Sequence, residues 1–456
     1  MEKGSMHQTS RMRLNELVRT LREEIRTGKR RAGEFLPSEK TLAVQYHLSN
    51  QSVRKGLDIL VGEGLIEKLP RVGTKVIGQP EAGQTTIKFG FHSSVTGEAD
   101  IHGLLARFHE KHPHIRVQAV PVSSDHFGYV KTYLSGGIFD AIMMNYTDFR
   151  YFTETNDAQL LQPLQRDPGH YEFLSDAFTL NGRLLVRPFI FSPLILCYNR
   201  EHFREAGLNE PDSSWRWEDL IRNAAKLAIP NERIGFHSDF YSPNRWPLLP
   251  LQMGARFERG AGGRIRLADT RMMEALRICR DMKNELPLLS EGITTGESER
   301  LLANGKVSMV ITSYFYLNYL KGETAFDLAP VPYLEKPVTL LLNIGLAVNS
   351  RSANREAAEE LVNFLTSEEA QQVIRQQTYS LPALRTAAEW NGDSGLYRPS
   401  RFSLFRETIP GFRYFTDMGV TVQELAEINR EVKLFWAALE SEETFCARIE
   451  EKARHA

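Results

Sequence analysis

A short polar stretch divides this 456-residue chain into two segments with different hydrophobic patterns. Residues 79–85 read Gln-Pro-Glu-Ala-Gly-Gln-Thr, a composition that favours a turn-rich linker. Before the stretch, apolar residues recur at helical spacing, and after it strand and helix patterns alternate. We therefore expect two domains, residues 1–78 and residues 86–456, because the chain is long enough to bury more than one core.

Charge is distributed unevenly between these segments. Residues 1–78 carry 15 Lys and Arg against 9 Asp and Glu, a net charge of +6, whereas the remainder carries 41 against 48, a net charge of −7. A basic head on an acidic body indicates that only the head binds a polyanion.

Other features of the sequence argue against a membrane-spanning, exported or metal-binding protein. No run of 18 apolar residues is present, and the polar first ten residues lack the apolar core of a signal peptide. Cys197, Cys279 and Cys446 lie far apart without metal-ligand spacing, which predicts buried reduced thiols. We expect a cytoplasmic protein that spans no membrane and holds no metal or cofactor.

The head has the pattern of a helix-turn-helix followed by two short strands. A first amphipathic helix is expected near residues 14–25, a second after the N-cap Ser38, and a third after the N-cap Ser49. The third helix should bury Val53, Leu57 and Leu60 and leave the polar residues at its start exposed, as a DNA-reading helix requires.

Two strands, residues 64–68 and 74–77, should follow as a wing with Arg71 at its tip. A small helical domain with ordinary solvated charges is the alternative. The ordered series Pro37-Ser38-Glu39, Ser49 to Arg54, Gly62 to Ile66 and Gly73-Thr74 argues against that alternative.

This series resembles the GntR-type winged helix over about residues 11–78. The resemblance implies a homodimer on double-stranded operator DNA and places these residues at the DNA: Lys40, Ser49, Asn50, Gln51, Ser52, Arg54, Arg71 and Gly73. Amide side chains can bind an adenine edge, and Arg or Ser can bind a base or a phosphate. Asn50 replaces the usual Arg, and Arg71 replaces a frequent Gly, so the operator sequence is not implied.

The body opens with alternating strands and helices. Strands are expected at residues 86–91, 115–120 and 139–144, and the helices between them present Leu104, Leu105 and Phe108, and then Tyr133 and Leu134. This alternation is typical of an α/β sheet that is buried on both faces.

Seven further segments resemble, in order, the extracellular solute-binding proteins of sugar ABC transporters over about residues 86–450. They are residues 108–117, 135–142, 181–188, 198–208, 217–220, 304–309 and 357–365. Phe139 and Arg216 depart from the usual Pro and Thr. The resemblance implies a two-lobed, periplasmic-binding-protein-like (type 2) fold, in which hinge strands join the lobes and the ligand lies between them.

A sugar site needs flat apolar faces and a few fixed polar groups. Candidates lie at strand ends or on the expected crossing segment, with Trp246 as the preferred stacking platform: Ser93, Asn145, Tyr146, Ser192, Tyr241, Arg245, Trp246, Ser313, Tyr314 and Asn343. As alternatives, the aromatic residues could be core packing and the serines could be helix caps.

The sequence thus predicts a bacterial transcription regulator, more specifically a repressor, that a mono- or oligosaccharide effector controls. The competing hypothesis is a winged helix fused to a pyridoxal-phosphate aminotransferase. Its Ser-x-x-Lys segment is missing, and so are Gly-x-Ser-x-Gly, Walker A and His-x-x-x-His patterns, so we do not expect an enzyme.

Overall fold

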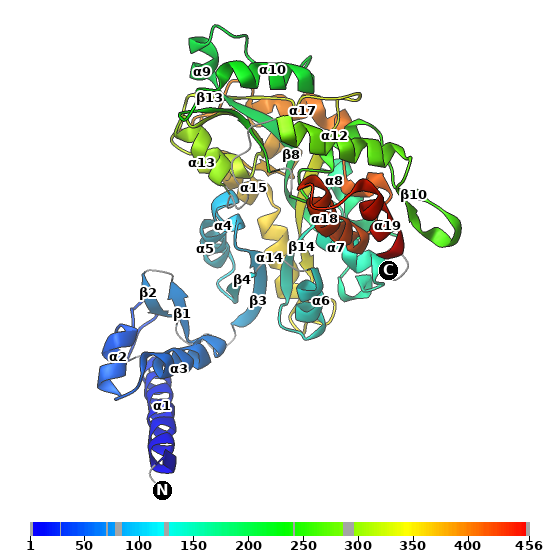
Figure 1. Ribbon diagram of the computed structural model, residues 1–456. Helices are drawn as coiled ribbons and strands as arrows, with labels where there is room; N and C mark the ends of the chain where they lie inside the picture. Colours follow the sequence, from blue (N-terminus) through cyan, green and yellow to red (C-terminus); the bar gives the residue numbers. More distant parts are fainter. Residues whose placement is uncertain are drawn as a thin grey trace. The chain divides into compact units, whose positions relative to one another are not determined.

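Figure 1 shows the computed structural model of the chain. The structure describes residues 3–27, 29–69, 72–77, 84–122, 127–239, 242–285 and 296–452. By internal contacts, the chain divides into two compact units: residues 1–86 with 112–118, and residues 87–111 with 119–456. Most of the predicted linker, residues 79–83, lies outside the described residues.

The first unit contains three helices and a two-stranded wing. Its elements are α1 (Lys3–Arg26), α2 (Glu39–Gln45), α3 (Asn50–Gly62), β1 (Ile66–Leu69) and β2 (Gly73–Val76). The Ser38 hydroxyl accepts a hydrogen bond from the Thr41 N–H, and the Ser49 hydroxyl accepts one from the Ser52 N–H, each at 3.1 Å. Both predicted N-caps are therefore confirmed.

The core of this unit forms where the three helices meet. Val53, Leu57 and Leu60 of α3 are at most 1% exposed and belong to one cluster with Leu17 and Leu21 of α1. Burial of this face explains why the helical spacing in the sequence predicted the elements correctly.

The wing is an antiparallel pair in which Ile66 lies opposite Val76 and Leu69 lies opposite Gly73. Phe35 adds an isolated bridge to Lys75, which the sequence pattern did not predict. The predicted wing tip, Arg71, lies outside the described residues.

One large mixed sheet organises the body, with strand order β4-β3-β5-β14-β8-β12-β9. Its strands are β3 (Thr85–His92), β4 (Ile115–Val122), β5 (Ala141–Asn145), β8 (Arg187–Asn199), β9 (Ile234–His237), β12 (Val307–Ser313) and β14 (Thr339–Val348). β3 and β5 are parallel, with Phe89 opposite Ala141. The three strands that the sequence predicted at the start of the body are confirmed.

The 13-residue strand β8 belongs to both lobes of the body. Up to Pro193 it pairs with β14. From Leu194 onward it pairs with β12, and from Leu196 it pairs with β13 (Phe326–Ala329) as well. All its residues are buried. This change of partner at one point confirms the crossing segment that was predicted at residues 191–193.

Helices complete the two layers around the sheet. In the second lobe α10 (Trp217–Leu227) contacts β9 and α13 (Glu297–Ala303) contacts β12, while in the first lobe α7 (Tyr146–Glu154) and α14 (Arg355–Leu365) contact β5 and β14. The remaining helices are α4 (Val95–Glu98), α5 (Ile101–Lys111), α6 (Phe127–Ser135), α8 (Glu172–Ala177), α9 (Arg200–Glu205), α11 (Leu248–Gln252), α12 (Arg271–Glu285), α15 (Glu368–Gln377), α16 (Arg385–Ala388), α17 (Phe405–Thr408), α18 (Val422–Trp436) and α19 (Glu442–Lys452).

Short strands and 3-10 turns connect these elements: β6 (Thr179–Leu180), β7 (Arg183–Leu184), β10 (Glu258–Arg259), β11 (Ile265–Arg266), β15 (Leu381–Pro382), β16 (Phe412–Arg413), η1 (Ala158–Leu160), η2 (Ala261–Gly263), η3 (Tyr316–Leu320), η4 (Phe402–Leu404), η5 (Ile409–Gly411) and η6 (Phe415–Met418). All three cysteines are buried and form no disulfide, as predicted. Within the described part of the chain, no helix has the length and apolar character needed to cross a bilayer.

Candidate functional site

The first turn of α3 presents the polar side chains that were predicted to read DNA. Asn50 and Gln51 are exposed, Ser52 is half-buried, and Lys40 of α2 is exposed as well. Because Ser49 uses its hydroxyl as the N-cap of α3, its first role is to fix where the helix starts.

Arg54 differs from its neighbours because it already has an ionic partner. Its Nε donates to a carboxylate oxygen of Glu39 on α2 at 2.6 Å. Both side chains retain solvent exposure, 65% and 30%, and exposed pairs of this kind contribute little to stability because water screens them. A DNA phosphate can therefore compete for the Arg54 guanidinium at little cost.

Gly73 begins β2 with a φ of +143°, a conformation that residues with side chains rarely adopt. It is exposed, and a side chain there would lie 3.2 Å from the Phe35 ring. Gly73 thus fixes the shape of the wing, and we infer no contact with bases from it.

A cavity of about 910 Å³ lies within the second unit. Its wall combines the ends of β3 and β12, the first half of β14, the first turns of α7 and α13, and one face of α18. The lining residues include His92, Ser94, Glu98, Asn145, Tyr146, Tyr151, Asp239, Arg245, Ser298, Glu299, Ser313, Phe315, Tyr316, Asn343, Phe415, Leu425, Asn429 and Arg430. The volume lies within the range of roughly 300–1,000 Å³ that small-molecule sites occupy.

Five of the predicted ligand residues lie on the cavity wall: Asn145, Tyr146, Arg245, Ser313 and Asn343. They come from four separate parts of the chain: Asn145 and Tyr146 lie where β5 ends, Ser313 ends β12, and Arg245 precedes α11. Asn343 lies within β14 and does not follow a strand, so the prediction of a strand end is wrong for this residue. Tyr241 lies outside the described residues.

Four other candidates do not line the cavity, and two of them are polar residues of the core. The Ser192 hydroxyl accepts the Tyr314 N–H at 2.7 Å and donates to the Pro193 carbonyl. The Tyr314 hydroxyl donates to the Phe402 carbonyl at 2.8 Å, and neither side chain is exposed. Both residues stabilise the crossing region between the lobes.

The choice of Trp246 as stacking platform is not supported by its position. The side chain is 0% exposed, and its ring meets the Trp436 ring edge to face at 6.2 Å. It is therefore core packing of the second lobe. Ser93 is exposed and lies off the cavity wall.

Several wall residues are hydrogen-bond acceptors without a protein donor. The Oδ1 atoms of Asn343 and Asn429 are buried and have no partner among the described residues. The Nδ2 group of Asn343 donates a hydrogen bond to the Leu174 carbonyl at 3.3 Å, and this bond fixes the orientation of the side-chain amide. Such acceptors are costly to bury unless a ligand or water supplies a donor.

Two carboxyl groups from opposite lobes add to this acceptor set. Glu98 of α4 is 6% exposed and accepts from the Ser94 hydroxyl at 3.3 Å, and burial raises its pKa to about 7. Glu299 of α13 is 2% exposed and accepts from the Thr312 hydroxyl, and burial raises the pKa of Glu299 as well. The wall can therefore present neutral carboxyl groups as donors or charged ones as acceptors.

Cationic and aromatic groups complete the wall. Arg245 is 8% exposed, lies 5.5 Å from the centroid of the Tyr316 ring and donates to the Asn244 carbonyl. The Tyr146 hydroxyl forms a hydrogen bond with the Thr416 hydroxyl at 2.9 Å. The Tyr146 ring is tilted by 30° against the Tyr414 ring, with the two centroids 4.0 Å apart. Aromatic faces next to fixed polar groups are what a sugar ring requires.

Sequence reasoning missed Glu98, Glu299 and Asn429. Glu98 could have been found, because it follows the same strand end as Ser93. Glu299 and Asn429 carry no such signal: they reach the wall only because α13 and α18 pack there.

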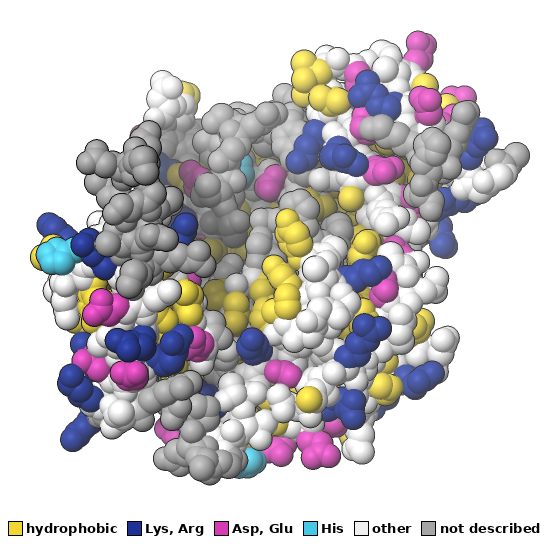
Figure 2. Space-filling view, turned by 90° about the horizontal axis from the view of Figure 1, so that it is seen from below, with side chains coloured by type: hydrophobic (Ala, Val, Ile, Leu, Met, Phe, Trp, Pro, Cys, Tyr) yellow, Lys and Arg dark blue, Asp and Glu magenta, His cyan; other side chains and the backbone are white. Residues whose placement is uncertain are grey.

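Figure 2 shows one face of the molecule, on which Lys and Arg side chains alternate with Asp and Glu. No single sign of charge dominates this face.

The sheet with its crossing strand and the cavity define a two-lobed solute-binding domain, which follows a winged helix-turn-helix in the same chain. Residues 92–372 match the family model described as bacterial extracellular solute-binding protein, and the chain belongs to this family. Residues 14–76 match the model of bacterial regulatory proteins, gntR family, which confirms the DNA-binding domain type.

Curated relatives resemble the body. A binding protein of Brucella abortus is 25% identical over 271 residues, which are 54% of this chain and 63% of that protein. An ABC transporter periplasmic-binding protein of Escherichia coli is 24% identical over 69% of this chain and 78% of its own length. The match thus spans less than two thirds of the Brucella protein.

Solved structures share the fold of the body. An ABC substrate-binding protein of Listeria monocytogenes in complex with cycloalternan has a TM-score of 0.68 at 20% identity, covering 81% of this chain and 98% of that one. Maltose-bound MalE3 of T. maritima has a TM-score of 0.68 at 17% identity, covering 81% and 99%. Both matched families are binding families, and neither is an aminotransferase.

Proposed function

We propose that this protein is a sequence-specific transcription regulator whose operator binding is controlled by a solute in the cavity of its second unit. The observation that carries the proposal is the presence in one chain of a GntR-type domain and a cavity lined by acceptors and aromatic rings. The protein acts in the cytoplasm, because operator DNA is there, and as a homodimer on two half-sites about one helical turn apart.

The chemistry of the wall supports a mono- or oligosaccharide as the effector. Asn343, Asn429, Glu98 and Glu299 offer acceptors, and sugar hydroxyls supply many donors. Tyr316 and Phe415 offer apolar faces for the C–H groups of a pyranose ring. A ligand that contacts both lobes favours one arrangement of the lobes, and it shifts operator affinity by its preference for that arrangement.

We propose that the protein represses its target genes until the sugar binds and lowers its affinity for the operator. DNase footprinting on DNA from upstream of the gene, with and without each member of a broad sugar panel, tests it. One sugar should lower operator affinity about 5–150-fold, the usual range of allosteric coupling. Unchanged affinity across the whole panel would contradict the control mechanism, although not DNA binding itself.

Two variants make the experiment specific to the cavity. Asn343→Leu removes a buried acceptor from the wall and should abolish the sugar response while operator affinity without sugar stays the same. Ser93→Ala, which alters an exposed hydroxyl off the wall, is the matched control and should respond like the wild type.

A further inference from the structure

Two arginines of the body lie around one aromatic ring. Arg375 lies in the last turn of α15 and is 2% exposed, and Arg398 is half-buried in the segment before η4. Their guanidinium carbons lie 4.6 Å and 4.5 Å from the centroid of the Phe402 ring. None of these residues lines the effector cavity.

Most of the donors of this pair have no acceptor. Arg375 Nη2 donates to the Trp390 carbonyl at 2.9 Å, and Arg398 Nη2 donates to the carbonyls of Thr378, at 3.1 Å, and Arg375. The Nε and Nη1 atoms of both arginines are buried and have no hydrogen-bond partner among the described residues, and the same holds for the Tyr379 hydroxyl. Buried donors are rarely left in this state.

Nor does a carboxylate balance the two charges. Among the described residues, neither arginine forms an ion pair, and burial lowers the pKa of Arg375 to about 10. Burial also lowers the pKa of Arg398, to about 9, and the neighbouring charge of Arg375 adds to this effect. Two like charges out of water therefore face each other without an anion from the protein.

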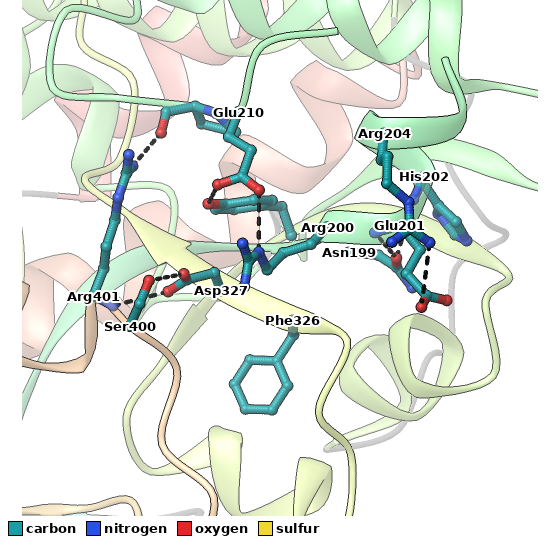
Figure 3. A network of polar contacts seen from close by, with 12 residues as sticks. Asn199, Arg200, Glu201, His202, Arg204, Glu210, Phe326, Asp327, Ser400 and Arg401 are labelled. Atoms are coloured by element: carbon teal, nitrogen blue, oxygen red, sulfur yellow. Dashed lines mark hydrogen bonds and ion pairs between the residues drawn. The ribbon is translucent and has the colours of Figure 1, made fainter. Parts of the chain in front are cut away.

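The acidic groups of the adjacent polar network are already occupied, as Figure 3 shows. Glu210 accepts from Arg200 at 3.1 Å and from Tyr198, and Asp327 accepts from Ser400 and from the Arg401 N–H at 3.0 Å. Arg200 thus has the carboxylate partner that Arg375 and Arg398 lack.

Two nearby groups offset part of the free-energy cost of burying these two charges. The carbonyl groups at the end of α15 carry partial negative charge, and the Phe402 face attracts both cations. Neither effect supplies acceptors to the four remaining guanidinium nitrogens, because the carbonyls bind only the Nη2 atoms.

We propose that Arg375 and Arg398 form a binding site for a phosphate group, separate from the effector cavity. A tetrahedral oxyanion can accept from one N–H edge of each guanidinium group and from the Tyr379 hydroxyl, and guanidinium groups bind phosphate through such a pair of neighbouring N–H groups. The phosphate is either inorganic or part of a phosphorylated metabolite.

Equilibrium dialysis of the full-length protein with ³²P-phosphate, at constant ionic strength, tests the site. We expect saturable binding that Arg375→Gln and Arg398→Gln each weaken at least about tenfold, and that the matched control Arg200→Gln leaves unchanged. Phosphate should also raise the Tm of the wild type more than that of either variant. Absence of saturable binding, or equal binding by wild type and both variants, would overturn the proposal.

One further variant and one competitor complete the experiment. Arg398→Lys keeps the buried charge but loses the planar fork, so this variant should fold and bind phosphate more weakly; undiminished binding would also overturn the proposal. Displacement of ³²P-phosphate by glucose 6-phosphate would identify a phosphorylated metabolite as the source, whereas its failure to compete would identify inorganic phosphate.

Discussion

At the scale of single residues, Glu98 gives the clearest prediction. Its carboxyl is buried and its pKa is raised to about 7, above the ordinary value of 4.5. Between these two pH values the folded state binds more protons than the unfolded state, so this group makes stability fall as pH rises from about 4.5 to 7. The total loss is on the order of 3 kcal/mol.

Chemical denaturation of ligand-free protein between pH 4.5 and 8 checks this prediction. Glu98→Gln removes the titration, so the free energy of unfolding of the variant, compared with the wild type, should rise progressively over that window. The difference between the two proteins isolates Glu98 from Glu299, whose pKa is also raised. A difference independent of pH would show that Glu98 ionises in the folded protein as it does in water.

At the scale of elements, we expect α3 and α2 to make two different kinds of DNA contact, one with a base and one with a phosphate. Gln51→Ala should relax base preference at one operator position, at a cost of about 1–3 kcal/mol, because an amide reads a base edge. Lys40→Ala on α2 should weaken binding to all sequences and lower the slope of the salt dependence by about 1. Binding curves on an operator variant library at several salt concentrations measure both effects, and equal behaviour of the two variants would mean that the recognition helix is wrongly assigned.

At the scale of the whole molecule, the two compact units have separate hydrophobic cores. We therefore expect two unfolding transitions in calorimetry. Operator DNA should raise only the Tm of the smaller transition and the effector sugar only that of the larger one, because each ligand stabilises the unit that binds it. A single transition that both ligands raise equally would indicate one cooperative unit.

Local sequence patterns predicted the helices and strands because interactions between neighbouring residues govern where these elements form. Ser38 and Ser49 are N-caps wherever a helix follows, and Val53, Leu57 and Leu60 share one helix face whatever lies against it. The ends of predicted strands likewise pointed to Asn145 and Ser313, which lie where β5 and β12 end, whereas Asn343 proved to lie within β14.

Only the tertiary structure decided which of these side chains reach the cavity. Trp246 and Trp436 lie 190 positions apart and pack together in the core, and no local pattern shows that contact. The same holds for Asn429, which α18 brings to the wall, and for Arg375 and Arg398 at Phe402. A sequence determines the periodicity of its own helices and strands, whereas burial of a given polar or aromatic group depends on distant segments that pack against it.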